Sequence, residues 1–540
     1  MNQITPLLSV LLLLAGSLRS QNPVASVEGQ ITPASVAAPI RFLSHDLLEG
    51  RGVGSRGDRL ARLYIATSFQ LYGLRPGAAD GEWEQPVPII GINARIARPL
   101  TATGKGGRIS FEAPRDYVVF AGRPDERTAF ENAEVVFVGY GITAPEEEWD
   151  DFKDVDVKGK VLLVMNNDPS SSPDLFAGKT RLYYGRWTYK YEEAARRGAV
   201  GAMIIHTTPS AGYPFDVIRA GHGKEDFHLP FREGQPTLAV QSWCSEEAAR
   251  KICSLGGHDL DALRRSAESR DFKPVPLGVR LDLETRNQVR ELRSANVLGR
   301  LEGSDPRLKE EVIVVTAHFD HLGRGRPLKG DDIYNGALDN ASGSSALLNL
   351  ARACAALSPR PRRSLLFAAV TAEESGLLGS RFLAENPPCP IKRIVADFNI
   401  DGINIWGPTK SLEMIGYGKN SLTALAETVA AGRGRKIKPD ADVDKGLFYR
   451  SDHFSFAKVG VPSAYFKAGN DFLERPGPRL RLKRSYVTVR YHKPSDEYDP
   501  RWRLTGAVED LRLILECIVR CANADAPPTW TPGDEFEKLR

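Results

Sequence analysis

Continuous apolar runs alternate with helix-like segments over the second half of this chain, and this alternation restricts the fold more than any other feature. The runs are rich in Val, Ile, Leu, Ala and Phe with little polar alternation, which predicts strands buried on both faces of a sheet. The segments between them repeat apolar residues at three- and four-residue steps, which predicts helices. Strand–helix alternation predicts an α/β fold with a mostly parallel mixed sheet sandwiched by helices. The runs are EEVIVVTAHFDH, RRSLLFAAVTAEE, RIVADFNIDGIN and GVPSAYFKAG.

Histidine and carboxylate residues follow the predicted strands at the points where the strands end. Ligand-binding residues of such sheets gather beyond the carboxyl ends of the strands, so these side chains are expected in one pocket. Several carboxylates held together would repel one another and raise each other's pKa values unless a divalent cation neutralised them. The residues concerned are His318, Asp320, Asp339, Glu373, Glu374 and Asp401, with His492 far downstream.

The ligand types in this pocket favour zinc over harder cations. The two histidines with three of the five carboxylates form a mixed nitrogen and oxygen ligand set of the kind that zinc accepts. Five ligands exceed what one tetrahedral zinc with an open position needs. They suit two ions roughly 3.5–4 Å apart, bridged by one carboxylate. The sequence therefore predicts a two-metal site.

Residues 40–74 show a helical pattern interrupted by the run GRGVGSRG. The run contains a GxGxxG motif at Gly52, Gly54 and Gly57. A dinucleotide-binding loop needs a strand before these glycines, whereas a helical pattern precedes them here. The motif is therefore not interpreted as a nucleotide site.

Residues 134–272 carry a separate βαβ-like rhythm in AEVVFVGYGI, VKGKVLLVMNND and YKYEEAARRGAVGAMIIH. This stretch resembles the protease-associated domain, a small α/β insert of several exopeptidase families. We find no catalytic constellation in it and expect a structural or substrate-gating role. Residues 24–133 and 273–525 are then the two parts of one catalytic domain, followed by a C-terminal tail at 526–540.

The first 20 residues indicate export. The apolar stretch from about Pro6 to Leu18 is too short to span a bilayer, which needs about 20 residues, and small residues follow it, as in a secretory signal peptide. We therefore expect a periplasmic or secreted protein with no membrane association after signal cleavage.

Charge and cysteine content add smaller expectations. The net charge of +4 is small for 540 residues and predicts no nucleic-acid partner. The basic cluster RLRLKR, residues 479–484, is expected in a solvated loop. Of the six cysteines, Cys517 and Cys521 lie four apart in a helix-like segment and are expected to pack as small hydrophobic residues. Cys244 and Cys253 are the nearby pair that we would test for a disulfide.

Six motifs together resemble the co-catalytic dizinc aminopeptidases of the secreted leucine-aminopeptidase and glutamate-carboxypeptidase superfamily. They are AHFDH, GALDNASG, TAEESGLLGS, NIDG, SDHFSF and YHKPSDEYD. The resemblance implies that His318 and Asp401 hold one zinc ion, that Glu374 and His492 hold the other, and that Asp339 bridges both. It implies that Glu373 is the general base and that Asp320 hydrogen-bonds the His318 imidazole.

The resemblance also implies a cis peptide bond between Asp339 and Asn340. The sequence NAS at Asn340 is a glycosylation sequon, but its place beside Asp339 argues against its use. Three further residues near the motifs are assigned weaker roles. Tyr465 is a candidate for oxyanion stabilisation or a core tyrosine, Asp452 could face the substrate, and His321 is expected beside the metals without binding them.

The implied function is a zinc aminopeptidase that hydrolyses N-terminal residues from peptides. A carboxypeptidase or dipeptidase with the same metal site is the first alternative, because the metal ligands do not separate these activities. A non-catalytic, receptor-like binding protein of this fold is a second alternative, which the complete ligand set disfavours. The sequence leaves the side-chain preference and the oligomeric state open.

Overall fold

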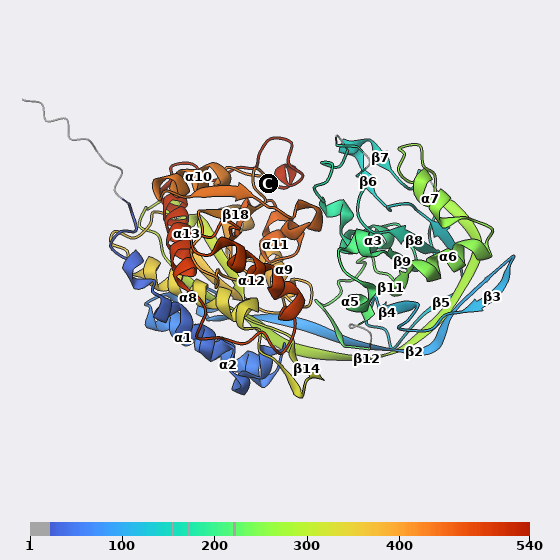
Figure 1. The fold of residues 1–540 in the computed structure, drawn as a ribbon, viewed down its shortest axis with the longest axis horizontal. Helices are drawn as coiled ribbons and strands as arrows, with labels where there is room; N and C mark the ends of the chain where they lie inside the picture. Colours follow the sequence, from blue (N-terminus) through green and yellow to red (C-terminus); the bar gives the residue numbers. More distant parts are fainter. Residues whose placement is uncertain (1–21, 154, 171, 174, 220–222) are drawn as a thin grey trace, which may run out of the picture.

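The structure is a computed structural model that describes residues 22–153, 155–170, 172–173, 175–219 and 223–540. The predicted signal segment, residues 1–20, lies outside the described residues. Figure 1 shows two lobes joined along one side by long strands. The larger lobe contains the N-terminal helices and most of the second half of the chain, and the smaller lobe contains most of residues 105–272.

The sheet of the larger lobe is mixed and mostly parallel, as predicted. Strand β13 pairs in parallel with β16 and β17, β17 pairs in parallel with β20, and β18 pairs in parallel with β19. The antiparallel pairs are β12 with β16 and β18 with β20. The order across the sheet is β19 (Lys436–Pro439), β18 (Ser411–Ile415), β20 (Ser463–Ala468), β17 (Ile394–Asn399), β13 (Val312–His318), β16 (Ser364–Val370) and the end of β12 (Val275–Leu301).

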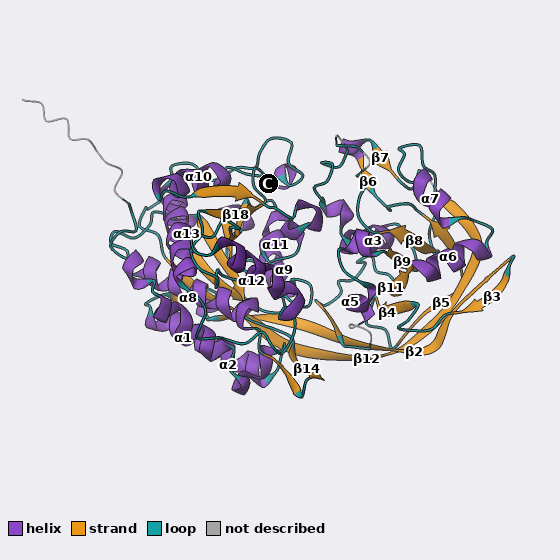
Figure 2. Cartoon of the chain, viewed as in Figure 1, coloured by secondary structure: helices purple, strands orange, loops and turns teal. Residues whose placement is uncertain are grey.

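Helices cover both faces of this sheet (Figure 2). On β16, Leu365 and Phe367 pack into the core under one helical layer, whereas Leu366 and Val370 pack into the core under the other. This division follows from the two-residue period of a strand and explains why the run is apolar throughout. The first layer contains α1 (Pro33–Leu43), α2 (Arg56–Leu71), α8 (Ser342–Ala355), α10 (Leu422–Gly432) and α13 (Thr505–Asn523), and the second contains α9 (Leu378–Glu385) and α11 (His453–Ala457).

The smaller lobe has its own parallel sheet and its own cores. Strands β5 (Arg127–Phe137), β8 (Val161–Met165), β9 (Gly201–His206) and β11 (Val240–Ser245) are parallel neighbours, and β4 (Tyr117–Ala121) pairs with β11 in the antiparallel direction. Helix α3 (Trp187–Arg196) packs on one face, and α6 (Glu246–Leu255) and α7 (Leu260–Ser266) pack on the other. Strand β4, which precedes Glu134, thus contributes to this sheet.

Two long antiparallel strands connect the lobes. Strand β2 (Glu84–Gly104) pairs with β12 from Glu84–Val297 at one end to Thr103–Arg280 at the other. The first half of β12 pairs with β5 of the smaller lobe, and its last five residues, Val297–Leu301, pair with β16 of the larger lobe. Strand β12 is therefore a single 27-residue strand that contributes to both lobes.

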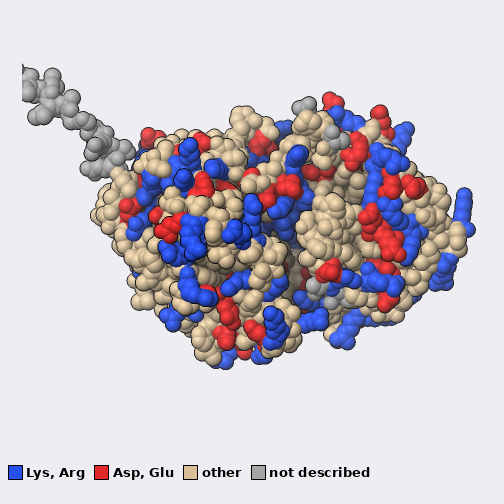
Figure 3. Space-filling view, in the orientation of Figure 1, with Lys and Arg blue, Asp and Glu red and all other residues tan. Residues whose placement is uncertain are grey.

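Shorter elements complete the described chain. They are β1 (Arg75–Pro76), β3 (Gly107–Ser110), β6 (Thr143–Ala144), β7 (Trp149–Asp150), α4 (Thr208–Ala211), α5 (Phe215–Arg219), β10 (Asp226–His228), β14 (Gly323–Leu328), β15 (Asp331–Tyr334) and α12 (Pro476–Val489). A hollow separates the lobes in the space-filling view, where acidic and basic side chains are interspersed (Figure 3).

Two smaller expectations are corrected by the structure. The basic cluster at 479–484 lies in helix α12 and not in a loop, because Pro476 begins the helix and its long side chains sustain it. Cys244 and Cys253 are both buried as free thiols, and all six cysteines are unpaired.

Among the described helices, none has both the length and the apolarity to cross a membrane.

Candidate metal centre

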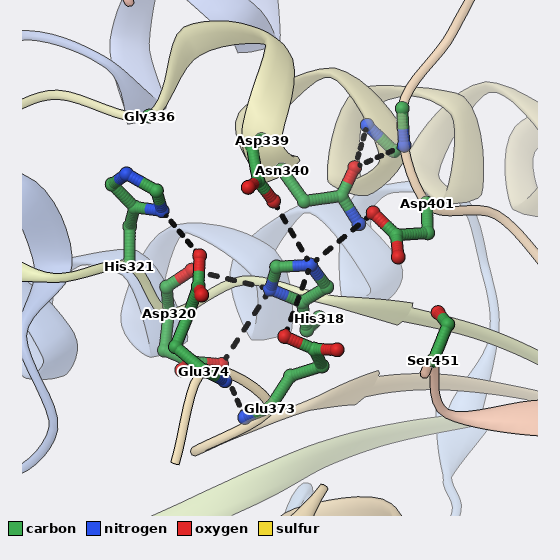
Figure 4. Close-up of polar contacts among 12 residues, drawn as sticks. His318, Asp320, His321, Gly336, Asp339, Asn340, Glu373, Glu374, Asp401 and Ser451 are labelled. Carbon is green, nitrogen blue, oxygen red and sulfur yellow. Dashed lines mark hydrogen bonds and ion pairs between the residues drawn. The ribbon is translucent and has the colours of Figure 1, made fainter. Parts of the chain in front are cut away.

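Neighbouring parallel strands bring the predicted site residues to one edge of the larger sheet. Strand β13 ends at His318, with β16 on one side and β17 on the other. The turn after β16 carries Glu373 and Glu374, and Asp401 follows β17 by two residues. Figure 4 shows these side chains converging around the His318 ring. The carboxyl ends of three adjacent strands therefore build the site, as expected for such a sheet.

One group of ligand atoms surrounds His318, which is buried. Its Nε2 lies 3.4 Å from Asp339 Oδ1 and 3.5 Å from Asp401 Oδ1. Asp339 lies at the start of the helical segment that leads into α8. Figure 4 shows Asp339 and Asp401 approaching the imidazole from different elements.

A second group surrounds His492, which comes from the loop after α12. Its Nε2 lies 3.2 Å from Asp339 Oδ2 and 3.0 Å from Glu374 Oε2. Asp339 therefore presents one carboxylate oxygen to each histidine. This arrangement is the one that a bridging carboxylate requires.

The spacing of these atoms is compatible with zinc coordination. Zinc ligands at 2.0–2.1 Å in a tetrahedron lie about 3.3 Å from one another, and the four distances above are 3.0–3.5 Å. The Nε2 atoms of His318 and His492 are buried and have no hydrogen-bond partner among the described residues. Buried polar atoms are nearly always satisfied, so the residues present fit a bound metal.

The charges in this pocket are strongly coupled. Burial alone would lower the pKa of His318, but Glu373, Asp339 and Asp401 raise it well above its usual range. Burial alone would raise the pKa of Asp339, but His318 and His492 hold it well below its usual range. Without a metal, imidazolium charge thus contributes to stabilising the carboxylates.

Glu373 and His321 lie beside the two groups. Glu373 Oε2 is 3.8 Å from His318 Nε2, which is farther than the carboxylates of either group. His321 Nδ1 is 2.6 Å from Glu374 Oε1, the oxygen that faces away from His492. By proximity alone, Glu373 can also join a cluster with His318 and Asp401, and His321 can join one with Asp339 and Glu374.

Two buried carboxylates hold the loops that carry the acidic ligands. Asp320 accepts hydrogen bonds from the backbone amides of Glu373 at 3.1 Å and Glu374 at 3.4 Å. Asp496 accepts hydrogen bonds from the amides of Leu338 and Asp339, both at 3.1 Å. Burial raises the pKa of Asp320 to about 7 and that of Asp496 to about 6.

The position of Asp320 differs from the expected contact with His318. The His318 Nδ1 atom lies 3.3 Å from the backbone carbonyl of Asp320 and 3.8 Å from its carboxylate. The carboxylate instead accepts hydrogen bonds from the two glutamate amides. Asp496 had no predicted role, although it lies within the YHKPSDEYD motif.

The weaker expectations have different outcomes. The Asp339–Asn340 peptide bond is cis, and the Asn340 side chain is buried and bonded to backbone groups of Ile400 and Gly343, so it is not an accessible sequon. Tyr465 is buried and donates its hydroxyl to the Asp401 carbonyl at 3.0 Å, as a core tyrosine does.

Comparisons with known proteins agree with this geometry. The sequence profile of Peptidase family M28 matches residues 296–515. Aminopeptidase NAALADL1 of Mus musculus is 29% identical over 183 residues, which are 31% of this chain and 23% of that protein. A probable zinc metalloprotease of Leptosphaeria maculans is 35% identical over 222 residues, which are 38% of this chain and 48% of that protein.

One solved structure shares the fold of both lobes. The aminopeptidase from Aneurinibacillus sp. strain AM-1 has a TM-score of 0.53 to this chain at 20% identity, over 92% of this chain and 95% of that one. The chain spans 23% to 48% of the length of the curated relatives it matches.

Proposed function

Since this chain carries a domain of peptidase family M28, we propose that it is an exported zinc-dependent aminopeptidase that removes N-terminal residues from peptides. The observation that carries the proposal is the position of Asp339, whose two oxygens lie 3.4 Å and 3.2 Å from the Nε2 atoms of different histidines. Two of its relatives are named aminopeptidases, which supports the proposal that this chain acts on peptides with a free amino terminus. The predicted signal segment, residues 1–20, supports export.

The proposed metal assignment follows the two groups of ligand atoms. His318 and Asp401 would hold one zinc ion, His492 and Glu374 would hold the other, and Asp339 would contribute an oxygen to each. Two zinc ions bound there would supply Lewis-acid polarisation of the scissile carbonyl and acidification of the attacking water.

Glu373 is the proposed general base. Its carboxylate would take a proton from the attacking water and deliver it to the nitrogen of the leaving amine. Burial raises the pKa of Glu373 well above its usual range, His318 opposes this shift, and Glu374 adds to it. As a general base and then a general acid, this carboxylate must both accept and return a proton during the reaction. Asp320 would fix this carboxylate by holding the Glu373 amide.

The smaller lobe is proposed to be a protease-associated insert that borders the substrate path. Tyr183 of this lobe packs against Tyr449 and Phe454, with ring centroids 6.0 Å and 5.0 Å away. These two residues lie on either side of Asp452 in the sequence. Burial raises the pKa of the Asp452 carboxyl group to about 6. The insert thus contacts the segment that adjoins the metal centre.

A panel of substrates tests the proposal. Purified protein is incubated with aminoacyl-anilides, with free peptides and with the same peptides blocked at the N-terminus, before and after removal of metal by a chelator. We expect release of N-terminal residues from unblocked substrates only, loss of activity on chelation and recovery with zinc.

The panel also separates the alternatives. Release of C-terminal residues from blocked peptides would establish a carboxypeptidase in place of an aminopeptidase. Cleavage restricted to dipeptides would establish a dipeptidase. Activity that survives complete metal removal would refute the zinc mechanism.

A further inference from the structure

Arg51 is a fully buried arginine whose guanidinium is surrounded by backbone carbonyl groups. Its Nε donates to the carbonyl of Phe319 at 2.6 Å, and its Nη2 donates to that of Gly336 at 3.0 Å. Its Nη1 donates to Asn335 at 2.7 Å and also to Leu43. Arginine has five N–H donors in a rigid fork, and here they bind four carbonyls from three separate segments.

Those segments include the two loops that carry the proposed metal ligands His318 and Asp339. One acceptor carbonyl follows His318 directly in the chain, and another lies three residues before Asp339. The backbone carbonyl of Arg51 also accepts a hydrogen bond from the amide of His321 at 3.4 Å. One residue near the N-terminus therefore ties together two loops that the sheet alone does not connect.

The guanidinium also places a positive charge among carboxylates. All four of its acceptors are backbone carbonyl oxygens, so no carboxylate forms a direct ion pair with this guanidinium in these hydrogen bonds. Burial lowers the pKa of Arg51 to about 10, against the effect of Asp320, Asp496 and Asp339, so it stays charged at neutral pH. A buried positive charge at this position offsets repulsion among the acidic side chains before any metal binds.

The backbone around Arg51 adopts a conformation that its local sequence disfavours. Glu49, Gly50 and Arg51 have φ values of 48°, 69° and 50°. Left-handed backbone costs non-glycine residues roughly 1–2 kcal/mol each. A Cβ on Gly50 would lie 2.4 Å from the carbonyl oxygen of Tyr334. The glycine-rich run excluded above as a nucleotide loop therefore has a different use, which is to turn the chain tightly and direct Arg51 inward.

We propose that Arg51 is a positioning residue for the metal centre. It holds the His318 and Asp339 loops at the separation that metal binding requires, and its charge keeps their carboxylates together in the metal-free chain. This inference rests on the proposed function only in assuming that zinc binds at Asp339. It concerns metal affinity and not the choice of peptide.

The test measures zinc affinity of the metal-free full chain by competition with a chromophoric chelator. Lysine keeps the charge of Arg51 but cannot span the four carbonyls. We expect Arg51→Lys to weaken zinc binding by about 10–100-fold, the usual cost of losing a group that orients metal ligands. We also expect an altered visible spectrum after cobalt substitution and a lower kcat with little change in KM.

Arg363 offers a matched control. It is equally buried, donates to the carbonyl of Cys521 at 3.3 Å and pairs with Glu311 at 2.6 Å. It adjoins the start of β16, the end opposite to Glu373. Arg363→Lys should lower the melting temperature while leaving zinc affinity and the cobalt spectrum unchanged.

The outcomes separate this inference from the proposed function. Zinc affinity within twofold of wild type in Arg51→Lys, or an equal loss in Arg363→Lys, would overturn the positioning role and leave the peptidase proposal standing. Failure of the wild-type chain to bind zinc would overturn the proposed function itself. If Arg51→Lys does not fold, Arg51→Ala is tested for restoration of zinc affinity by added guanidinium and not by ammonium. No restoration, or no folded protein, would also overturn the role.

Discussion

The adjacent residues Glu373 and Glu374 are expected to respond differently to the same substitution. In each case glutamine keeps the size of the side chain and removes its charge. Glu374 Oε2 lies 3.0 Å from His492 Nε2, within the range of the other ligand contacts, whereas Glu373 Oε2 lies 3.8 Å from His318 Nε2. These distances favour the proposed roles, in which Glu374 binds metal and Glu373 transfers the proton.

The expected magnitudes follow from these roles. Loss of a general base costs about 10²–10⁴-fold in rate, so Glu373→Gln should lower kcat by that factor, or about 3–5.5 kcal/mol in activation free energy. It should retain both metals. Glu374→Gln replaces a charged ligand by a neutral amide and should weaken zinc binding at one position by more than the roughly 100-fold that loss of a supporting contact costs.

The assay combines turnover of an aminoacyl-anilide with metal analysis of the same dialysed samples. We expect Glu373→Gln to retain two zinc ions per chain and to show almost no turnover. We expect Glu374→Gln to retain one zinc ion. Glu385 pairs with Arg381 on the surface of α9 and is the site of the control substitution. Glu385→Gln should change neither the turnover nor the metal content. Loss of a metal from Glu373→Gln, or two tightly bound metals in Glu374→Gln, would refute the assignment.

Three further predictions concern other buried groups. Asp320→Asn should lower kcat by about 10–100-fold with both metals retained, because an amide cannot accept both glutamate N–H groups; an unchanged kcat would refute this. Burial raises the pKa of Asp510 to about 6 and its partner Arg435 opposes the shift, so the native state binds this proton more tightly than the unfolded state. The contribution of Asp510 to stability should therefore fall by about 2.4 kcal/mol between pH 4 and pH 7, measured as the difference in unfolding free energy from Asp510→Asn, and a constant difference would contradict it. Only Cys389 is partly exposed, so one thiol should react with a thiol reagent in the native protein and six after denaturation without reductant; fewer than six would indicate a disulfide.

Much of the larger lobe could be predicted because its information is local. The buried strands are visible as short apolar runs, and each run that leads to the site ends in a histidine or carboxylate. Parallel pairing then brings His318, Glu374 and Asp401 to the same edge without further information. The prediction of the mixed parallel sheet was confirmed for this reason.

Other features depend on contacts that no local pattern encodes. Arg51 reaches Phe319 across 268 positions of sequence, and its own turn violates backbone preferences, so propensity gives no indication of its role. Asp496 acts through backbone amides of another loop. Helix α12 buries none of its residues and lacks the apolar periodicity by which a helix is recognised. The contacts of Arg51 and Asp496 join distant segments, which the sequence pattern does not specify, whereas α12 was missed because it lacks that periodicity.

The most direct measurement is anomalous X-ray scattering at the zinc absorption edge from crystals of the zinc-loaded protein. The bridging position of Asp339 predicts two peaks roughly 3.5–4 Å apart, one beside His318 and Asp401 and the other beside His492 and Glu374. A single peak, or two peaks that do not share Asp339, would contradict the two-metal site on which the proposed aminopeptidase mechanism depends.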